Sequence, residues 1–234
     1  MKRPWILLVV AAVSAYACTS VVPRAVRGSG NIVTQTFDVT DFSEIELSTI
    51  GEVELIQGDE DSLVVETDDN ILPYLEIKAR NGRLVLADKG NIALLPSGTI
   101  TYWLTARTVE ALEVNSSGSI SAAGVSADDL KVALDGSGLV DLLAAEARTC
   151  AVTSSGSGQI KIVEMACDTL DVDMSASGGV DLAGETGFLQ VDSSGSGDAR
   201  LGEMMASDVK AKLDGSGDVT VWAADSLDVE IHGS

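Results

Sequence analysis

A repeat of about 20 residues runs through the second half of this chain. Its most regular element is a Gly-Ser-Gly-like turn, whose second glycine falls at Gly118, Gly138, Gly158, Gly178, Gly197 and Gly217. Four residues before each turn glycine lies a column of mostly apolar residues, and the apolar pattern resumes two and four residues after it. The column comprises Val114, Leu134, Ser154, Met174, Ser193, Leu213 and Ile231, at spacings of 20, 20, 20, 19, 20 and 18. Repeats of this length with period-two apolar residues predict short strands stacked in a solenoid.

One repeat, residues 132–142, shows how a rung is built. Val132 and Leu134 precede the turn and Val140 and Leu142 follow it, so two strands flank a turn of Gly and Ser. We expect the second turn glycine to need either a positive φ or a close backbone approach. Because no segment between turns is long enough for a crossover helix, each strand should lie on its counterpart in the next rung. The prediction is an all-β, single-stranded parallel β-helix with rungs of about 20 residues.

One outward position of the repeat carries charges that alternate in sign. Its members are Ser121, Asp141, Lys161, Asp181, Arg200 and Thr220. We interpret this ladder as support for the register of the rungs, and a binding surface is the alternative. Ser154 and Ser193 interrupt a column that should face inward, and a stacked pair of hydroxyls bonded to the backbone is one explanation.

Composition excludes several classes of function. The 234 residues carry a formal net charge of −21, which leaves no contiguous basic surface for a nucleic acid. Aromatic residues make up only 4% of the chain, so small and branched aliphatic side chains must form the core. We expect no nucleic-acid partner.

The N-terminus resembles an export signal. Lys2 and Arg3 precede an apolar run and a small-residue end at Ala15-Tyr16-Ala17, so residues 1–17 are predicted to be a signal peptide. Cys18 follows at the position of the lipidated cysteine of bacterial lipoproteins, with residues 18–27 as a tether. Ordinary cleavage with an unmodified cysteine is the alternative. By the same resemblance, Thr19 favours the outer membrane. The mature chain would keep 13 basic and 36 acidic groups, a charge of 13 − 36 = −23.

Cys150 and Cys167 are the other two cysteines. Aligned by rung, Cys150 stacks with Leu130 and Leu170, whereas Cys167 lies three positions before Leu170. The two are therefore diagonal to each other. A disulfide remains open, and two buried thiols are the interpretation that we favour.

The first half repeats the template more loosely. Residues 47–55 and 86–94 each have the strand, glycine and strand offsets of a rung, and segments 63–65 and 75–77 can form another layer. We expect one solenoid over residues 28–234, irregular over 28–108 and regular over 109–234. Residues 231–234 stop within a turn motif, so we expect the sequence to be incomplete there.

Several segments resemble the family of the putative auto-transporter adhesin, head GIN domain, found in bacterial envelopes. The likeness lies in segments 28–31 (GSGN), 42–47 (FSEIEL), 51–58 (GEVELIQG) and 63–72 (LVVETDDNIL), and in the later Gly-Ser-Gly rungs. The resemblance implies a right-handed parallel β-helix in an exported or lipid-anchored protein.

The sequence suggests no catalytic, cofactor or metal site. The single histidine, His232, lies in the last turn, which argues against a Ser-His-Asp arrangement and a histidine-rich zinc site. Asp135 with Asp141, or Asp214 with Asp218, could stand at the spacing of a glycosidase pair. Residues 214–218 also resemble a calcium loop faintly. Solvated turn carboxylates are the interpretation that we favour for these aspartates.

The leading hypothesis is a non-enzymatic, exported envelope lipoprotein. It would be anchored at Cys18 to the outer membrane and would bind an envelope protein or glycan in an adhesin-like manner. The alternative is a polysaccharide-binding or polysaccharide-cleaving β-helix with outer-face carboxylates. Acids clustered in a groove lined by aromatic residues such as Trp103 or Trp222 would favour this alternative, and acids scattered around the turns would favour the first hypothesis.

Overall fold

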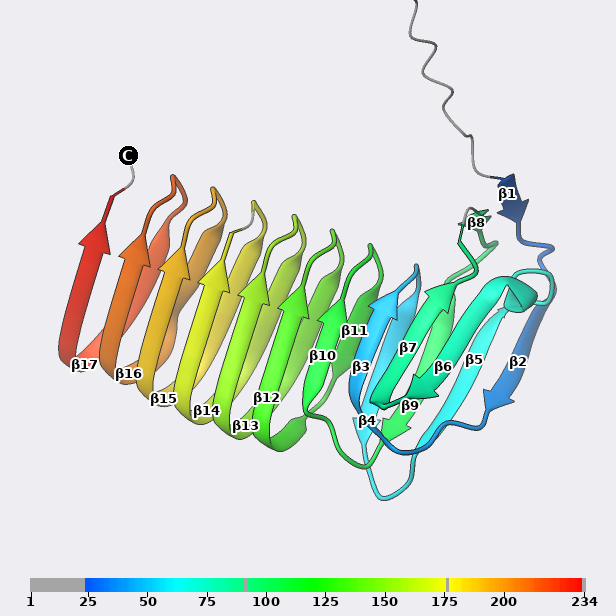
Figure 1. The fold of residues 1–234 in the computed structure, drawn as a ribbon, viewed down its shortest axis with the longest axis horizontal. Helices are drawn as coiled ribbons and strands as arrows, with labels where there is room; N and C mark the ends of the chain where they lie inside the picture. Colours follow the sequence, from blue (N-terminus) through cyan, green and yellow to red (C-terminus); the bar gives the residue numbers. More distant parts are fainter. Residues whose placement is uncertain (1–23, 91, 176, 233–234) are drawn as a thin grey trace, which may run out of the picture.

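The fold is a parallel β-helix whose rungs stand in a single row (Figure 1). The computed structural model describes residues 24–90, 92–175 and 177–232. Its first half comprises β1 (Arg24–Arg27), β2 (Ile32–Phe37), β3 (Phe42–Ser48), β4 (Glu52–Gln57), β5 (Ser62–Asp68), the short 3-10 helix η1 (Leu72–Tyr74), β6 (Leu75–Arg80), β7 (Gly82–Asp88), β8 (Ile92–Leu95) and β9 (Thr101–Ala106). Its second half comprises β10 (Ala111–Val114), β11 (Ser119–Ala122), β12 (Val125–Leu134), β13 (Leu139–Ser154), β14 (Gln159–Met174), β15 (Gly179–Ser193), β16 (Asp198–Leu213) and β17 (Val219–Ile231).

The rungs of the second half pair in parallel, one repeat apart. Leu130 pairs with Cys150 and Cys150 with Leu170, as the repeat predicts. Each rung from β13 onward is one long strand of 13 to 16 residues that bends around a corner, rather than two short strands. The predicted parallel β-helix with rungs of about 20 residues is therefore confirmed.

The core consists of apolar columns that run from rung to rung. One column contains Val53, Ile120, Val140, Ile160 and Val180, all fully buried. Its neighbour contains Leu55, Ala122, Leu142, Ile162 and Leu182, all at most 6% exposed. A rung cannot cover its own apolar edges, so each layer depends on the next.

The turn glycines are needed for close approach and not for an unusual φ. A Cβ built on Gly158 would lie 2.1 Å from the carbonyl oxygen of Gly138, and one on Gly178 would lie 2.0 Å from that of Gly158. The same oxygens accept hydrogen bonds from the next rung, for example from the amide of Gln159 to Gly138 at 3.1 Å. Of the two expected reasons for the glycine, the structure supports the second.

Ser154 and Ser193 do not form a stacked pair. Met174 lies between them in the column, because Ser154 pairs with Met174 and Met174 with Ser193. Ser154 is fully buried, and its hydroxyl has no hydrogen-bond partner among the described residues. The explanation by two stacked hydroxyls is therefore wrong. The long Met174 side chain instead alternates with two small ones in the same column.

The first rungs are capped by antiparallel strands. β3 pairs in parallel with β10 and β4 with β11, so these two strands continue the stack toward the N-terminus. β7 pairs in parallel with β3 in turn, and β9 with β4. β6 then pairs antiparallel to β7, β5 antiparallel to β9, and β2 antiparallel to β5. The layer expected from segments 63–65 and 75–77 exists, but its strands run in the opposite direction.

The prediction of a rung at residues 86–94 is wrong for its second half. β7 lies in the stack as predicted, but β8 leaves it and pairs in parallel with β1. β9 takes the position next to β4 instead, and it pairs with β5 on its other side. Figure 1 shows β1 and β8 together, apart from the row of rungs. Residues 24–27, placed in the tether by the sequence, are thus part of the folded chain.

The two N-terminal motifs that carry the family resemblance contact each other. Gly30 donates its amide to the carboxylate of Asp68 at 2.7 Å, and the hydroxyl of Ser29 donates to Asp69 at 2.6 Å. Asn31 donates its side-chain amide to Asp69 at 2.9 Å. The segments GSGN and TDDN thus fasten the start of the domain to the end of β5.

Candidate functional site

The strand segments that follow the Gly-Ser-Gly turns form one outer face, which we call the patterned face. It comprises the outward-facing side chains of residues 119–123, 139–143, 159–163, 179–183, 198–202 and 219–221. Its members come from neighbouring rungs, so side chains at equal positions stand about 4.8 Å apart. A parallel β-helix holds such rows rigidly because each strand is bonded on both sides.

The charged ladder on this face has the predicted register. Ser121 pairs with Asp141, Asp141 with Lys161, Lys161 with Asp181, Asp181 with Arg200, and Arg200 with Thr220. Arg200 donates to Asp181 at 3.2 Å and to Asp198 at 2.9 Å. Among the described residues, neither Asp141 nor Lys161 forms an ion pair. The ladder therefore supports its own register at only one end.

A second, apolar ladder runs beside the charged one. Leu143 is 58% exposed and Val163 is 40% exposed, and each lies two residues beyond a member of the charged ladder. Ala123 follows Ala122, which pairs with Leu142, and Ala183 follows Leu182, which pairs with Ile162, so the two alanines flank this pair. Adjacent large apolar side chains on a solvent face are characteristic of interaction surfaces. The sequence analysis missed this ladder, although the 20-residue spacing of Leu143 and Val163 marks it.

Two grooves flank the ladders. A groove of about 620 Å³ follows the turns and is lined by polar and small residues, including Ser137, Ser157, Gln159 and Asp198. A second groove of about 470 Å³ is lined by the later members of both ladders, from Lys161 and Val163 onward, and by Gly202, Glu203 and Thr220. Arg200 lines both grooves, so the two form one continuous surface.

A third groove lies at the corner of the rungs. It has a volume of about 560 Å³, and it combines acidic residues with exposed Met205 and Trp222. Its carboxylates include Glu146 and Glu185, which stand two rungs apart because Ala166 pairs with both. At about 4.8 Å per rung, their backbones are roughly 10 Å apart. The acids of this groove are spread over several rungs.

Cys167 opens onto the same groove, whereas Cys150 is buried behind it. Both are free thiols, and they hydrogen-bond each other. The hydrogen bond from Cys150 lowers the pKa of the Cys167 thiol, and the same contact, together with burial, raises the pKa of Cys150. Of the two alternatives for this pair, the structure has the two thiols.

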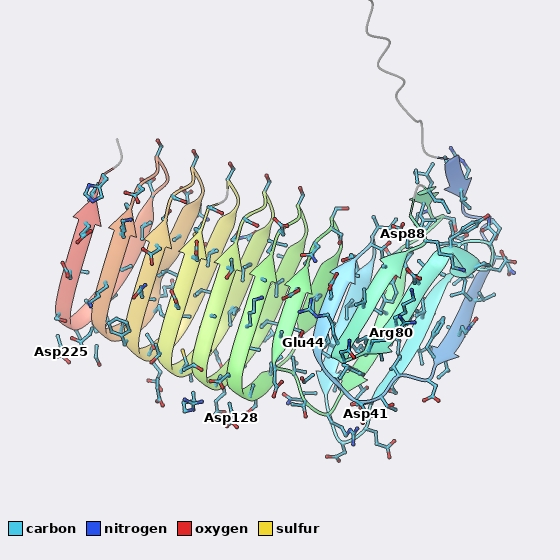
Figure 2. All side chains as sticks on the ribbon, in the orientation of Figure 1. Asp41, Glu44, Arg80, Asp88, Asp128 and Asp225 are labelled. Carbon is cyan, nitrogen blue, oxygen red and sulfur yellow. The ribbon has the colours of Figure 1, made fainter. Side chains whose placement is uncertain are left out.

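The aspartates considered for catalysis make separate contacts. Asp135 accepts a hydrogen bond from the hydroxyl of Ser155 in the turns, whereas Asp141 belongs to the charged ladder. Asp214 pairs with Lys212 at 2.9 Å, and the amide of Asp218 donates to Asp198 at 3.3 Å. In Figure 2, Asp41, Asp128 and Asp225 lie at separate turns along the molecule.

The remaining candidates are exposed. Trp103 on β9 is 50% exposed and faces outward beside Glu54 and Val64. His232 stands 3.9 Å from Glu230 at the last rung. No group of three or more potential metal ligands occurs within the described residues.

Cys18 and the predicted signal, residues 1–17, lie outside the described residues. In the part of the chain from residue 24 onward that the structure describes, no helix has the length and apolarity to cross a membrane.

Several solved structures have the same fold. The chain is similar to a protein of Parabacteroides distasonis described as a putative lipid binding protein, with a TM-score of 0.82 and 21% identity over 90% of this chain and 98% of that chain. It is also similar to a putative adhesin of Parabacteroides merdae, with a TM-score of 0.78 and 18% identity over 90% and 98% of the two chains. A putative adhesin of Bacteroides fragilis is similar as well, with a TM-score of 0.70 and 17% identity over 88% of this chain and 100% of that chain. At these identities the likeness establishes the fold alone.

No protein of curated function matched the chain. A family model did match, over residues 41–234, and its description is putative auto-transporter adhesin, head GIN domain. The description of this family is that of an adhesin, which is a binding protein, and it does not favour polysaccharide cleavage. The match covers most of the rungs described above, so the chain belongs to the putative auto-transporter adhesin, head GIN domain family.

Proposed function

We propose that this chain is an exported, non-enzymatic binding module of the bacterial envelope, and that the patterned face is its binding surface. One observation carries the proposal: on that face a charged ladder and an exposed apolar ladder run in parallel across the same rungs. The partner is an envelope protein or a glycan. The relatives named as adhesins and as a lipid binding protein support a binding role for the family.

The patterned face suits recognition because its chemistry is fixed by the backbone. Side chains at equal positions cannot drift relative to one another while the rungs stay paired. Little ordering of the protein is then needed on binding, which favours affinity. The groove between the ladders combines apolar walls near Val163 with charged rims at Lys161 and Glu203.

A binding screen tests this role. The purified full chain is offered to arrays of envelope glycans and to envelope proteins, alongside the variants Leu143→Glu and Arg148→Asp. Leu143 is an exposed member of the patterned face, whereas Arg148 is an exposed residue that pairs with Asp129 elsewhere. We expect Leu143→Glu to weaken capture of a ligand at least tenfold and Arg148→Asp to leave it unchanged. Equal binding by both variants would show that the binding site does not lie on this face.

The anchor is the second part of the proposal. We infer that Cys18 is lipidated after removal of residues 1–17 and holds the chain at the outer membrane. The basic, apolar and small-residue order before Cys18 supports this. A single acyl chain gives only marginal membrane binding, so the several chains of a bacterial lipoprotein would be required.

Mass spectrometry of the mature N-terminus tests the anchor. We expect a lipid-modified Cys18 as the first residue, and fractionation of the chain with outer membranes. Cys18→Ser should lose the modification and leave the membrane fraction. A mature chain with an unmodified cysteine would rule the anchor out while leaving the binding role open.

A further inference from the structure

The charges of the patterned face are complementary to themselves when read in reverse. Along the stack the central four positions are Asp141, Lys161, Asp181 and Arg200, that is, minus, plus, minus, plus. Reversed, the order becomes plus, minus, plus, minus. Two copies of this face laid against each other with opposite stacking directions therefore place opposite charges together at all four positions.

We propose that the patterned face binds the patterned face of a second copy, through a two-fold axis that runs along the strands between the rungs of Lys161 and Asp181. The inference rests on the proposed function, because it assigns a partner to the same face. A two-fold interface uses one patch twice, so that patch must be complementary to itself.

The two-fold axis fixes every pair of the ladder. Asp141 faces the partner's Arg200, and Lys161 faces the partner's Asp181. At the two ends Ser121 faces the partner's Thr220, so two hydroxyls meet. Asp141 and Lys161, which form no ion pair among the described residues, thus gain a charged partner. An axis at any other rung would leave part of the ladder unmatched.

The apolar ladder fits the same axis. Rotation about the strand direction reverses the order of the rungs but keeps the position along the strand. Val163 therefore meets the partner's Ala183. Leu143 meets the bulge of the partner's β16, where the register shifts so that Ala183 pairs with Glu203 and Gly202 is the extra residue. Gly202 is exposed and lines the groove of about 470 Å³, which provides space for the partner's Leu143.

The other acids on this face do not oppose the arrangement. Asp198 and Glu203 lie on the rung of Arg200. Asp198 pairs with Gly179 and would face the partner's Leu139, and Glu203 pairs with Ala183 and would face the partner's Leu143. Among the described residues of the face, the two-fold therefore creates no pair of like charges directly opposite each other. Like-charge pairs directly opposite each other would oppose a close interface.

The size of the face sets the expected strength. Six rungs at about 4.8 Å span roughly 24 Å, and five residues at about 3.3 Å span roughly 16 Å. The footprint is then roughly 400 Å² per copy, about half that of a standard stable interface. We expect a dimer with a dissociation constant in the micromolar to millimolar range that weakens as salt screens the ladder.

Sedimentation equilibrium of the purified full chain tests the proposal, from micromolar to millimolar concentration and at low and physiological ionic strength. We expect wild type to associate reversibly, and more strongly at low salt. Arg200→Asp would face the partner's Asp141, and Asp141→Arg would face the partner's Arg200. Each variant alone should weaken association at least tenfold.

A mixture of these two variants is the decisive measurement. Across the proposed axis, the new Arg at 141 faces the new Asp at 200, and the unchanged Arg200 of one variant faces the unchanged Asp141 of the other. Association should therefore return in the mixture, which damage to the charge ladder within one chain could not produce. Arg148→Asp serves as the matched control and should associate like wild type.

Loss of Arg200 also removes two ion pairs within the chain, so thermal midpoints are measured for every variant. Leu143→Glu, which touches no ion pair, provides an independent variant that should dissociate the dimer. A wild-type chain that stays monomeric throughout, or a mixture no stronger than its components, would overturn the proposal. If the chain stays monomeric but still captures a ligand in a way that depends on Leu143, the proposed function stands and the proposed dimer is wrong.

Discussion

The carboxylate of Asp68 accepts two hydrogen bonds from Ser97, one from the hydroxyl at 2.6 Å and one from the backbone amide at 2.8 Å. It also accepts the amide of Gly30 at 2.7 Å, so one side chain joins three segments that are far apart in sequence. Gly28 is required beside it, because a Cβ there would lie 2.4 Å from the Asp68 carboxylate. Asp68 thus holds the start of the domain, β5 and the segment after β8 together.

Asp68→Ala should lower the thermal midpoint of the chain. It should also loosen the N-terminal cap, that is, the antiparallel strands β2, β5 and β6 at the first rungs, at a lower temperature than the rungs themselves. The substitution leaves the amides of Gly30 and Ser97 without the acceptor of their part-buried hydrogen bonds, which lowers stability. Hydrogen exchange should show faster exchange at these two amides and little change in β13 to β16. Asp59→Ala, in the exposed turn after β4, is the matched control. Unchanged exchange at Gly30 in the Asp68 variant would contradict this role.

The same contacts make the cap sensitive to acid. The hydrogen bond from the Ser97 hydroxyl, followed by the one from the Ser97 amide, lowers the pKa of Asp68 below its ordinary value of 3.8. A carboxyl with a lowered folded-state pKa stabilises the fold above its unfolded pKa, and this stabilisation is lost as the pH falls through the folded value. We expect the thermal midpoint of wild type to fall more steeply than that of Asp68→Asn below pH 3.8. Parallel curves would contradict the assignment.

Gly158→Ala should be far more destabilising than the same change at Gly98. A Cβ at position 158 would lie 2.1 Å from the carbonyl oxygen of Gly138, whereas one at position 98 has no heavy atom within 4 Å. The rungs must separate to admit the methyl group, which breaks the hydrogen bond from Gln159 to the same oxygen. We expect a loss of about 1–3 kcal/mol in the free energy of unfolding at Gly158.

Urea denaturation of both variants measures this difference. Gly98→Ala should change the free energy of unfolding by less than about 1 kcal/mol, since its methyl group meets open space. Similar losses at the two positions would mean that backbone entropy, rather than close approach between rungs, explains the glycine column.

The repeat predicts the regular rungs because each rung repeats the same environment. Cys150 lies between Leu130 and Leu170, and the ladder from Ser121 to Thr220 has the expected register, because a constant spacing leaves only one way to stack. The apolar ladder could have been found by the same reasoning. Leu143 and Val163 are 20 residues apart and follow inward residues, so they must face outward.

The N-terminal cap could not be predicted in the same way. The period-two pattern of β5 and β6 is identical in either chain direction, so it does not distinguish a parallel layer from an antiparallel one. The contact between Gly30 and Asp68 joins residues 38 apart and occurs once, so no spacing reveals it. The departure of β8 from the stack likewise depends on pairing with β1, at the opposite end of the first half.

Cys167 should react with iodoacetamide well before Cys150. Its thiol borders the groove beside Thr186, and the hydrogen bond from Cys150 lowers its pKa, which increases the reactive thiolate. Burial and the same contact raise the pKa of Cys150. Peptide mass spectrometry after a short reaction should find the label at position 167.

Cys150→Ala is the matched variant for this reaction. It removes the donor, so the pKa of Cys167 should rise and alkylation near neutral pH should slow by several-fold. Preferential labelling of Cys150, or an unchanged rate in the variant, would contradict the pairing of the two thiols.

Ile160 and Val163 lie on the same strand but on opposite sides of it, and this difference tests where the core lies. Ile160 is fully buried in the column between Val140 and Val180, whereas Val163 is 40% exposed on the patterned face. Ile160→Ala leaves a cavity that two neighbouring rungs cannot fill, so it should cost about 2–5 kcal/mol. Val163→Ala should change the free energy of unfolding by about 0.5 kcal/mol or less. Urea denaturation followed by circular dichroism compares the two. Comparable losses would place Val163 in the core, and the exposed apolar ladder would then need no partner to explain it.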